Sequence, residues 1–155
     1  MTYLSKSVAI IGGTGALGLG LATRWARAGI TVIIGSRDAG RASEAAHEIQ
    51  GATGAAPAGM ANGAAAAAAE VVALAVPFVG REAILDSIRE GCQGKIVIDS
   101  TVPLMPPRVG TVTLPPGGSA AQMCQQTLGE GARVVAAFHN VAADKLLGHG
   151  AIDCD

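Results

Sequence analysis

The chain has 155 residues, of which 50% are hydrophobic and 15% charged, and its formal net charge is −1. This apolar fraction excludes a disordered chain, and the length suits one domain with a core of its own. The near-zero charge, with a pI of about 6.3, provides no electrostatic basis for binding nucleic acid or an anionic membrane. Glycine and alanine, with 22 and 31 residues, make up about a third of the chain, but glycine has no period of three, which excludes a collagen-like sequence.

Cysteine usage indicates the redox compartment. Cys92, Cys124 and Cys154 lie far apart, with no CxxC motif and no spacing typical of metal ligands. We therefore expect reduced thiols in a cytoplasmic protein and no metal site. The apolar run between Lys6 and Gly12 is too short for a signal peptide, and no apolar stretch has the length of a membrane span.

The first half of the chain alternates between strand and helix patterns. Residues 7–11 and 31–34 are continuous apolar runs, typical of strands buried on both faces. Between them a helix over 17–28, ended by Gly29, is predicted by an apolar face that contains Leu17, Leu21, Trp25 and Ala28. Three further segments follow: a helix over 41–50, a poorly marked stretch over 51–59 with room for a short edge strand, and a helix over the alanine run 64–69.

The second half continues the alternation. A strand over 70–76 stops at Pro77, an amphipathic helix covers 79–90, and a strand over 95–98 leads into a proline-rich loop over 103–116. The last elements are a helix from Ser119, its expected N-cap, to Leu128 and a strand over 133–138. Alternating strands and helices predict an α/β fold, a doubly wound parallel sheet of the Rossmann type, with residues 1–155 as a single dinucleotide-binding domain.

A glycine-rich loop follows the first predicted strand. The motif G-x-G-x-x-G occurs as Gly13, Gly15 and Gly18, between a strand and a helix. In such a turn Gly13 permits the tight bend, Gly15 lets the backbone approach a pyrophosphate, and Gly18 allows close helix–strand packing. The N–H groups at the start of the helix then face the phosphates, which the positive end of the helix dipole favours. A glycine-rich turn without a ligand is the alternative.

The residues after the second strand bear on the choice of cofactor. An NAD-preferring site usually has an acidic residue here, whereas this chain has Ser36 and Arg37. Arg37 is able to bind a 2′-phosphate through its two-pronged guanidinium, and Arg41 adds charge four residues later. Asp38 is more simply a helix cap. The pattern favours NADP over NAD, with a solvated surface arginine as the alternative for Arg37.

Ligands of open parallel sheets bind beyond the carboxyl ends of the strands, where this chain places two of its four aromatic residues, Phe78 and Phe138. Both offer a flat apolar surface for a planar ring, or they simply close the core. His139 is a candidate proton donor and is equally plausible as a structural histidine. Asp99 is expected to orient a loop or cap a turn. No residue is firmly predicted to be catalytic.

Taken together, these motifs resemble the NADPH-dependent reductases of coenzyme F420, the F420H2:NADP oxidoreductases. The resemblance covers almost the whole chain in family order, through Ile10–Gly20, Val32–Asp38, Val72–Phe78, Lys95–Leu104, Gly118–Ala121 and Arg133–Ala143. It implies that NADP is held by Thr14 to Leu17, Ser36, Arg37 and Arg41. It also implies that the nicotinamide and the deazaflavin lie near Val76, Pro77, His139, Asn140, Val141, Ala142 and Ala143.

The resemblance implies direct hydride transfer between NADP(H) and the deazaflavin F420, in which the protein mainly aligns two planar rings. It also implies a homodimer and a family C-terminal part, absent from this chain, that helps to complete the deazaflavin pocket. Two alternatives stay open: an NADPH-dependent reductase of another small substrate, and a non-catalytic NADP-binding module.

Overall fold

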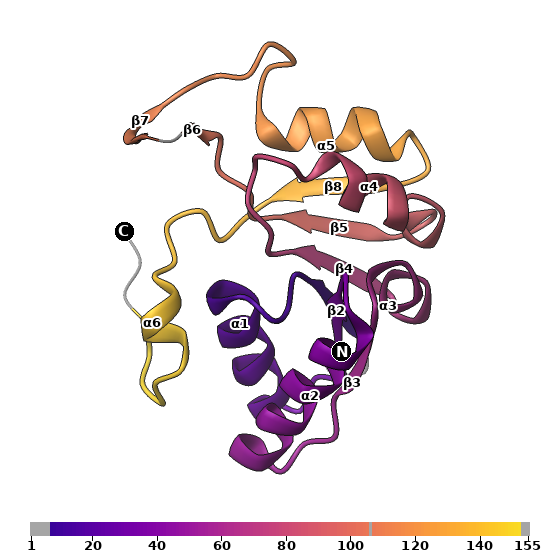
Figure 1. Cartoon of the computed structure of the whole chain (residues 1–155), viewed down its shortest axis with the longest axis vertical. Helices are drawn as coiled ribbons and strands as arrows, with labels where there is room; N and C mark the ends of the chain where they lie inside the picture. The colour runs from indigo at the N-terminus through magenta and orange to yellow at the C-terminus, as the bar shows by residue number, and fades with distance from the viewer. Residues whose placement is uncertain (1–6, 106, 153–155) are drawn as a thin grey trace.

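The computed structural model describes residues 7–105 and 107–152, and its centre is a parallel sheet of six strands. These strands are β1 (Val8–Ile11), β2 (Val32–Ser36), β3 (Ala58–Ala61), β4 (Val71–Leu74), β5 (Ile96–Asp99) and β8 (Arg133–Ala136). They lie in the order β3-β2-β1-β4-β5-β8, and every neighbouring pair is parallel (Figure 1). This topology confirms the predicted doubly wound α/β fold, and β3 is the expected short edge strand.

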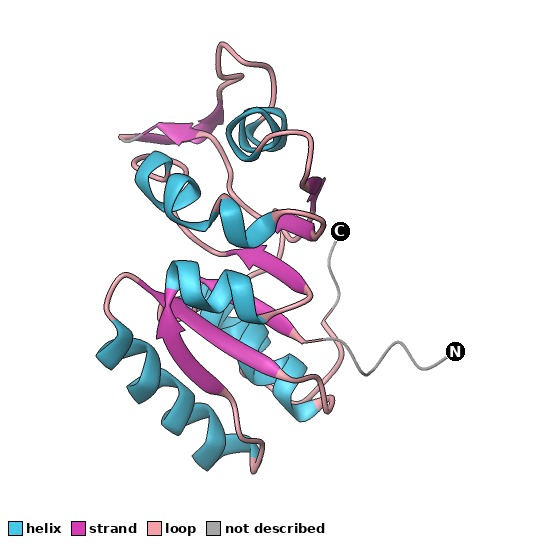
Figure 2. Cartoon of the chain, turned by 90° about the vertical axis from the view of Figure 1, so that its right-hand side faces the viewer, coloured by secondary structure: helices cyan, strands magenta, loops and turns pink. Residues whose placement is uncertain are grey.

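Helices cover both faces of the sheet. One face carries α1 (Ala16–Arg27), α2 (Ala39–Thr53) and the short α6 (Ala143–Leu146), and the other carries α3 (Asn62–Ala68), α4 (Glu82–Ile88), the 3-10 turn η2 (Glu90–Cys92) and α5 (Ala120–Leu128). In Figure 1, α1 and α6 lie to the left of the strands and α3 to the right, and Figure 2 shows helices in front of and behind the sheet. None of the helices in the described residues is long and apolar enough to span a bilayer.

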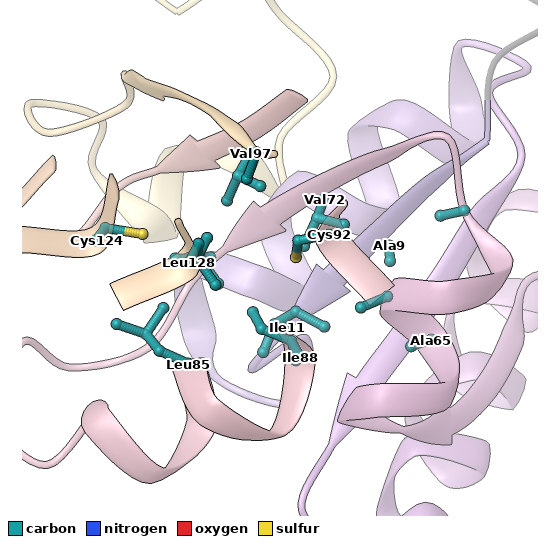
Figure 3. Close-up of a cluster of buried hydrophobic side chains, with 14 of the residues drawn as sticks. Ala9, Ile11, Ala65, Val72, Leu85, Ile88, Cys92, Val97, Cys124 and Leu128 are labelled. Carbon is teal, nitrogen blue, oxygen red and sulfur yellow. The ribbon is translucent and has the colours of Figure 1, made fainter. Parts of the chain in front are cut away.

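The sheet separates two apolar clusters, because successive side chains of a strand point to opposite faces. In β1, Ala9 and Ile11 belong to the cluster under α3, α4 and α5, whereas Val8 and Ile10 belong to the cluster under α1, α2 and α6. Figure 3 shows the first cluster, with Leu85 of α4 among its members. Burial on both faces explains why β1 is a continuous apolar run in the sequence.

Several glycines allow helices to approach the sheet at backbone distance. A Cβ atom at Gly18 of α1 would lie 2.5 Å from the carbonyl oxygen of Gly12, closer than real Cβ contacts come. A Cβ atom at Gly59 of β3 would overlap the backbone of Ala42 in α2. The part of the glycine excess that lies at such positions is therefore a packing requirement.

The proline-rich loop over 103–116 contains a hairpin that the sequence did not predict. β6 (Leu104–Met105) pairs antiparallel with β7 (Arg108–Val112). A strand forms here because residues 108–112 are free of proline and include valine and threonine, which favour extended backbone. The prediction of one long loop was wrong for these residues.

Several predicted boundaries of strands and helices also differ from those in the structure. The strand predicted over 70–76 pairs only at β4, and the last strand ends at Ala136 rather than Phe138. The helix predicted from Val79 begins at Glu82, because Gly80 has a φ of +80° that a helix does not accept. The predicted apolar face of α1 packs against the cluster through Leu17, Leu21 and Trp25, whereas Ala28 is exposed. The helix also buries Gly18, Ala22 and Ala26, because it must bring Gly18 against the loop.

Cys92 and Cys124 are free thiols in the cluster of Figure 3. Burial raises the pKa of Cys92 from 9.0 to about 11, against a smaller lowering by Lys95. Burial raises the pKa of Cys124 to about 12, and Asp99 adds to the shift. Both side chains therefore stay protonated near neutral pH and behave as small apolar residues. Cys154 lies outside the described residues.

The packing role of Gly59 has a matched control in Gly51, which lies on the exposed side of α2, where an added Cβ atom would meet no other atom within 4 Å. Gly59→Ala should lower the free energy of unfolding by about 1–3 kcal/mol through overpacking. Gly51→Ala should raise it by about 0.5–1 kcal/mol, because alanine favours a helix. Urea denaturation measures both, and equal effects of the two substitutions would contradict the close-approach argument.

Candidate functional site

A cavity of about 610 Å³ opens at the carboxyl edge of the sheet. The strand order reverses between β1 and β4, so this edge holds the switch point at which open α/β sheets bind ligands. Gly12 follows β1, Ala75 follows β4, and both line the cavity. Its remaining walls are the loop after β2 and the beginnings of α2, α3 and α4.

The glycine loop forms the floor of the cavity beside α1. Gly12, with a φ of +80°, is the residue that needs the left-handed conformation, whereas Gly13 is buried with no room for a side chain beside Ile34. The tight bend predicted for Gly13 is therefore made by its neighbour. Gly15 is exposed and is the N-cap of α1, with no side chain capping the helix. The first-turn N–H groups of α1 lack intrahelical partners by helix geometry, and they provide an anion-binding end.

The end of β2 supplies the cationic wall of the cavity. Ser36 is buried and its Oγ accepts a hydrogen bond from the N–H of Asp38 at 3.3 Å. Arg37 and Arg41 are exposed and line the cavity. The Asp38 carboxylate accepts from the N–H groups of Gly40 and Arg41, at 2.8 and 3.2 Å, as the N-cap of α2. Its predicted capping role is confirmed, and the carboxylate is occupied by helix amides.

The cavity brings together one part of the predicted site. It is lined by Thr14, Gly15, Ser36, Arg37, Arg41, Val76 and Pro77. Gly13, Ala16, Leu17 and Phe78 flank it in sequence but do not line it, and His139, Asn140, Val141, Ala142 and Ala143 lie outside it. The sequence did not single out Val79, Gly80 or Ile84 as lining residues, because small and apolar side chains carry no distinctive motif.

The segment over 139–143 follows β8 at the same edge of the sheet. It begins after Phe138, a non-glycine residue with a φ of +66°, a conformation that costs about 1–3 kcal/mol. The Phe138 ring packs edge-on against Trp25, with 5.9 Å between ring centroids, beside the cluster under α1. Of the two interpretations left open for Phe138, core closure is therefore the one for which the structure has a contact.

Two arginines of α1 hold the chain that follows this segment. Arg24 donates hydrogen bonds to the carbonyl oxygens of Leu146 and Gly150, each at 2.8 Å, and Arg27 donates to that of Leu147 at 3.1 Å. These carbonyls lie at the end of α6 and just after it, where cations are favoured. The helix that begins in the glycine loop therefore also anchors the chain after segment 139–143.

A buried ion pair supports the opposite wall. The Arg81 guanidinium contacts the Asp99 carboxylate at 3.0 Å, and both side chains are at most 2% exposed. Arg81 also donates to the Thr101 hydroxyl and, at 2.7 Å, to the carbonyl oxygen of Ala120, and it lies over the Phe78 ring at 4.6 Å from the centroid. This network joins the β4–α4 loop, the end of β5 and the start of α5. Asp99 orients a loop as predicted, but its partner was not foreseen.

The arrangement suits phosphate binding and ring alignment more than acid–base chemistry. His139 is exposed and lies outside the cavity. Within residues 7–105 and 107–152, no three His, Cys, Asp or Glu side chains are grouped to hold a metal ion. The polar side chains that line the cavity are Thr14, Ser36, Arg37, Asp38, Arg41 and Asn62, next to the backbone amides at the start of α1.

Comparison with known proteins identifies the family. The model of a family described as NADP oxidoreductase coenzyme F420-dependent matches residues 7–103. An F420-dependent NADP reductase of Methanothermobacter thermautotrophicus is 44% identical over 96% of this chain. The chain belongs to the coenzyme F420-dependent NADP oxidoreductase family. A second relative, the F420-dependent NADP reductase of Methanocaldococcus jannaschii, is 37% identical to this chain. The chain spans 67% of the length of the first relative and 70% of the second.

Solved structures of other reductases share the fold of this oxidoreductase family member. An imine reductase from Bacillus cereus superposes with a TM-score of 0.59 at 25% identity, over 84% of this chain and 40% of that one. A pyrroline carboxylate reductase from Plasmodium falciparum, solved with NADP bound, superposes with a TM-score of 0.55 at 14% identity, over 86% of this chain and 42% of that one. The chain thus spans less than half the length of either protein, and the second likeness shows the fold alone.

The buried ion pair and an exposed one provide a matched test of what holds the cavity wall. Arg81→Met should lower the free energy of unfolding by about 3–5 kcal/mol, because it leaves Asp99 buried without its partner. Arg89→Met removes a pair with Asp86 whose side chains are 51% and 60% exposed, together with an exposed hydrogen bond to the carbonyl oxygen of Thr127. It should cost less than about 1–2 kcal/mol, because all these groups are open to water. Urea denaturation measures the free energy of unfolding of the two variants. Similar losses of stability in both would show that the cavity wall does not depend on the buried pair.

Proposed function

We propose that this protein transfers a hydride between NADP(H) and coenzyme F420. One observation carries the proposal: the helix N-terminus after β1 and the two arginines after β2 face one cavity at the switch point of the sheet. The family match and the names of the relatives, F420-dependent NADP reductases, supply the redox partner.

The residues around the cavity fit an NADP molecule. Its pyrophosphate would face Thr14, Gly15 and the amides of Ala16 and Leu17, where the exposed Gly15 has no side chain to hinder a close approach. Its 2′-phosphate would face Ser36, Arg37 and Arg41, as charge and donor geometry require. A volume of about 610 Å³ is in the range of cofactor sites.

When bound, the two cofactors supply the chemistry: a hydride passes between nicotinamide C4 and deazaflavin C5, and one proton is exchanged with solvent. The protein's part is alignment of two planar rings and exclusion of water. Val76 and Pro77 on the Arg81 side, with the segment His139 to Ala143 after β8, are the residues we assign to this end of the site. No side chain is assigned as a proton donor.

A second candidate is an NADPH-dependent reductase of another small substrate. The superposition on an imine reductase favours it, because the same nucleotide-binding half serves a different reaction there. This candidate and a non-catalytic NADP-binding module share the predicted NADP site, and they differ from the first in the partner of the nicotinamide.

We further propose a cytoplasmic homodimer. Free buried thiols at Cys92 and Cys124 support a reducing compartment. The outer strand β8 supports a subunit contact, because it ends the sheet in the described residues and an edge strand presents backbone groups that another chain is able to cover. Sedimentation as a monomer at assay concentration would contradict the dimer.

Mixing the protein with NADPH and oxidised F420 should bleach the visible absorbance of the deazaflavin and consume NADPH one for one. The reaction with NADH in place of NADPH should be much slower, because Arg37 and Arg41 lose the 2′-phosphate they face. Unchanged absorbance at high protein concentration would overturn F420 reductase activity. Consumption of NADPH with an imine instead would favour the second candidate, and NADP binding without any turnover would favour the binding module.

The assignment of the 2′-phosphate is tested by Arg37→Ala. Loss of a charge-assisted hydrogen bond should weaken NADP binding by about 10- to 100-fold and leave NAD binding nearly unchanged. Arg133→Ala, an exposed arginine at the start of β8, is the control and should alter neither. Titration calorimetry measures both ligands, and equal losses for NADP and NAD in Arg37→Ala would refute the assignment.

A further inference from the structure

Asn62 has a buried oxygen that lacks a partner. It is the first residue of α3, directly after β3, and only 6% of it is exposed. Its Oδ1 is fully buried and, among the described residues, accepts no hydrogen bond. Buried carboxamide oxygens are normally satisfied, since leaving one without a donor costs free energy. The described residues therefore leave this oxygen without a donor.

The position of Asn62 restricts what that donor is. It lines the cavity together with Ser36, Arg37 and Arg41. It also lines a second hollow of about 330 Å³, which shares Ser36 and Arg37 with the cavity. Asn62 therefore lies between the arginine-lined wall of the cavity and the second hollow.

The second hollow is mostly apolar. Its further walls come from the end of β3 and from α4, with Ala61, Ala83 and Ile84 as the apolar side chains. The Asn62 Oδ1 itself faces β2, since a Cβ at Gly35 would be 3.1 Å from it. Because this oxygen is buried, the carboxamide has to turn for it to meet a ligand in the cavity. Cationic side chains next to an apolar hollow match a phosphorylated ribose that carries a flat base.

We propose that Asn62 Oδ1 accepts a hydrogen bond from the adenosine half of NADP. The inference rests on the proposed NADP site. It adds a residue that binds the base and ribose of the adenosine half rather than the phosphates. Two groups of that unit are able to donate a hydrogen bond to a carboxamide oxygen, the 6-amino group of adenine and the 3′-hydroxyl of the ribose. Because Oδ1 is unsatisfied in the free protein, removing it should cost binding and not folding.

Titration calorimetry with NADP tests the proposal on the intact chain. Asn62→Ala should bind NADP about three- to tenfold more weakly, the loss expected for one neutral hydrogen bond. Its melting temperature without ligand should be no lower than that of Ser43→Ala, a control that removes a hydroxyl bonded within α2. Asn62→Leu, which keeps the volume and lacks the acceptor, replaces Asn62→Ala if the smaller variant does not fold.

Nicotinamide hypoxanthine dinucleotide phosphate, which lacks the 6-amino group, distinguishes the two donors. If the amino group is the donor, the wild-type protein discriminates against this analogue and Asn62→Ala does not. If the ribose hydroxyl is the donor, Asn62→Ala weakens NADP and the analogue equally. Unchanged NADP affinity in both folded Asn62 variants overturns the inference alone, whereas a wild-type protein that does not bind NADP overturns the proposed site as well.

Discussion

Close approach of backbones is the constraint on which the rest of the structure depends. α1 can start directly at the end of β1 only because Gly18 has no side chain to collide with Gly12. This contact points the unpaired amides of the helix into the cavity at the switch point of the sheet. A second close backbone contact lies between β3 and α2, where Gly59 packs against the backbone of Ala42. A chain rich in glycine and alanine is thus suited to a sheet with tightly packed helices on both faces.

Two groups of arginines support the segments that surround the cavity. Arg81, paired with Asp99, supports the loop that carries Val76 and Pro77. Arg24 and Arg27 hold the chain after β8 against α1. A buried pair of this kind adds little net stability but strongly penalises its own disruption, so it restricts the arrangements open to the loop. Ring alignment in the proposed reaction requires such restriction, because hydride transfer depends on geometry more than on acid–base groups.

Parts of the site formed by neighbouring residues were predictable from the sequence, whereas contacts between residues far apart in the sequence were not. The glycine loop and the Ser36–Arg37 pair are local patterns next to predicted strands. Both contribute to the lining of the cavity, the loop through Gly12, Thr14 and Gly15. The Arg81–Asp99 pair spans 18 residues and the Arg24–Leu146 bond 122, so no local pattern announced them. Asn62 was visible only as a polar residue before an alanine run. That its oxygen has no donor could not be predicted, because this depends on how β2 and α4 pack around Asn62 in the folded chain.

The sequence by itself determined the alternation of strands and helices, and with it a parallel sheet, since apolar runs of strand length joined by helices pair in parallel. It also determined the phosphate loop and the cationic end of β2, because these need only neighbouring residues. The tertiary structure decided the burial of Gly18 in α1, the β6–β7 hairpin, the anchoring of α6 and the buried pair. These features depend on side chains that meet only after the crossovers have brought distant strand ends to one edge of the sheet.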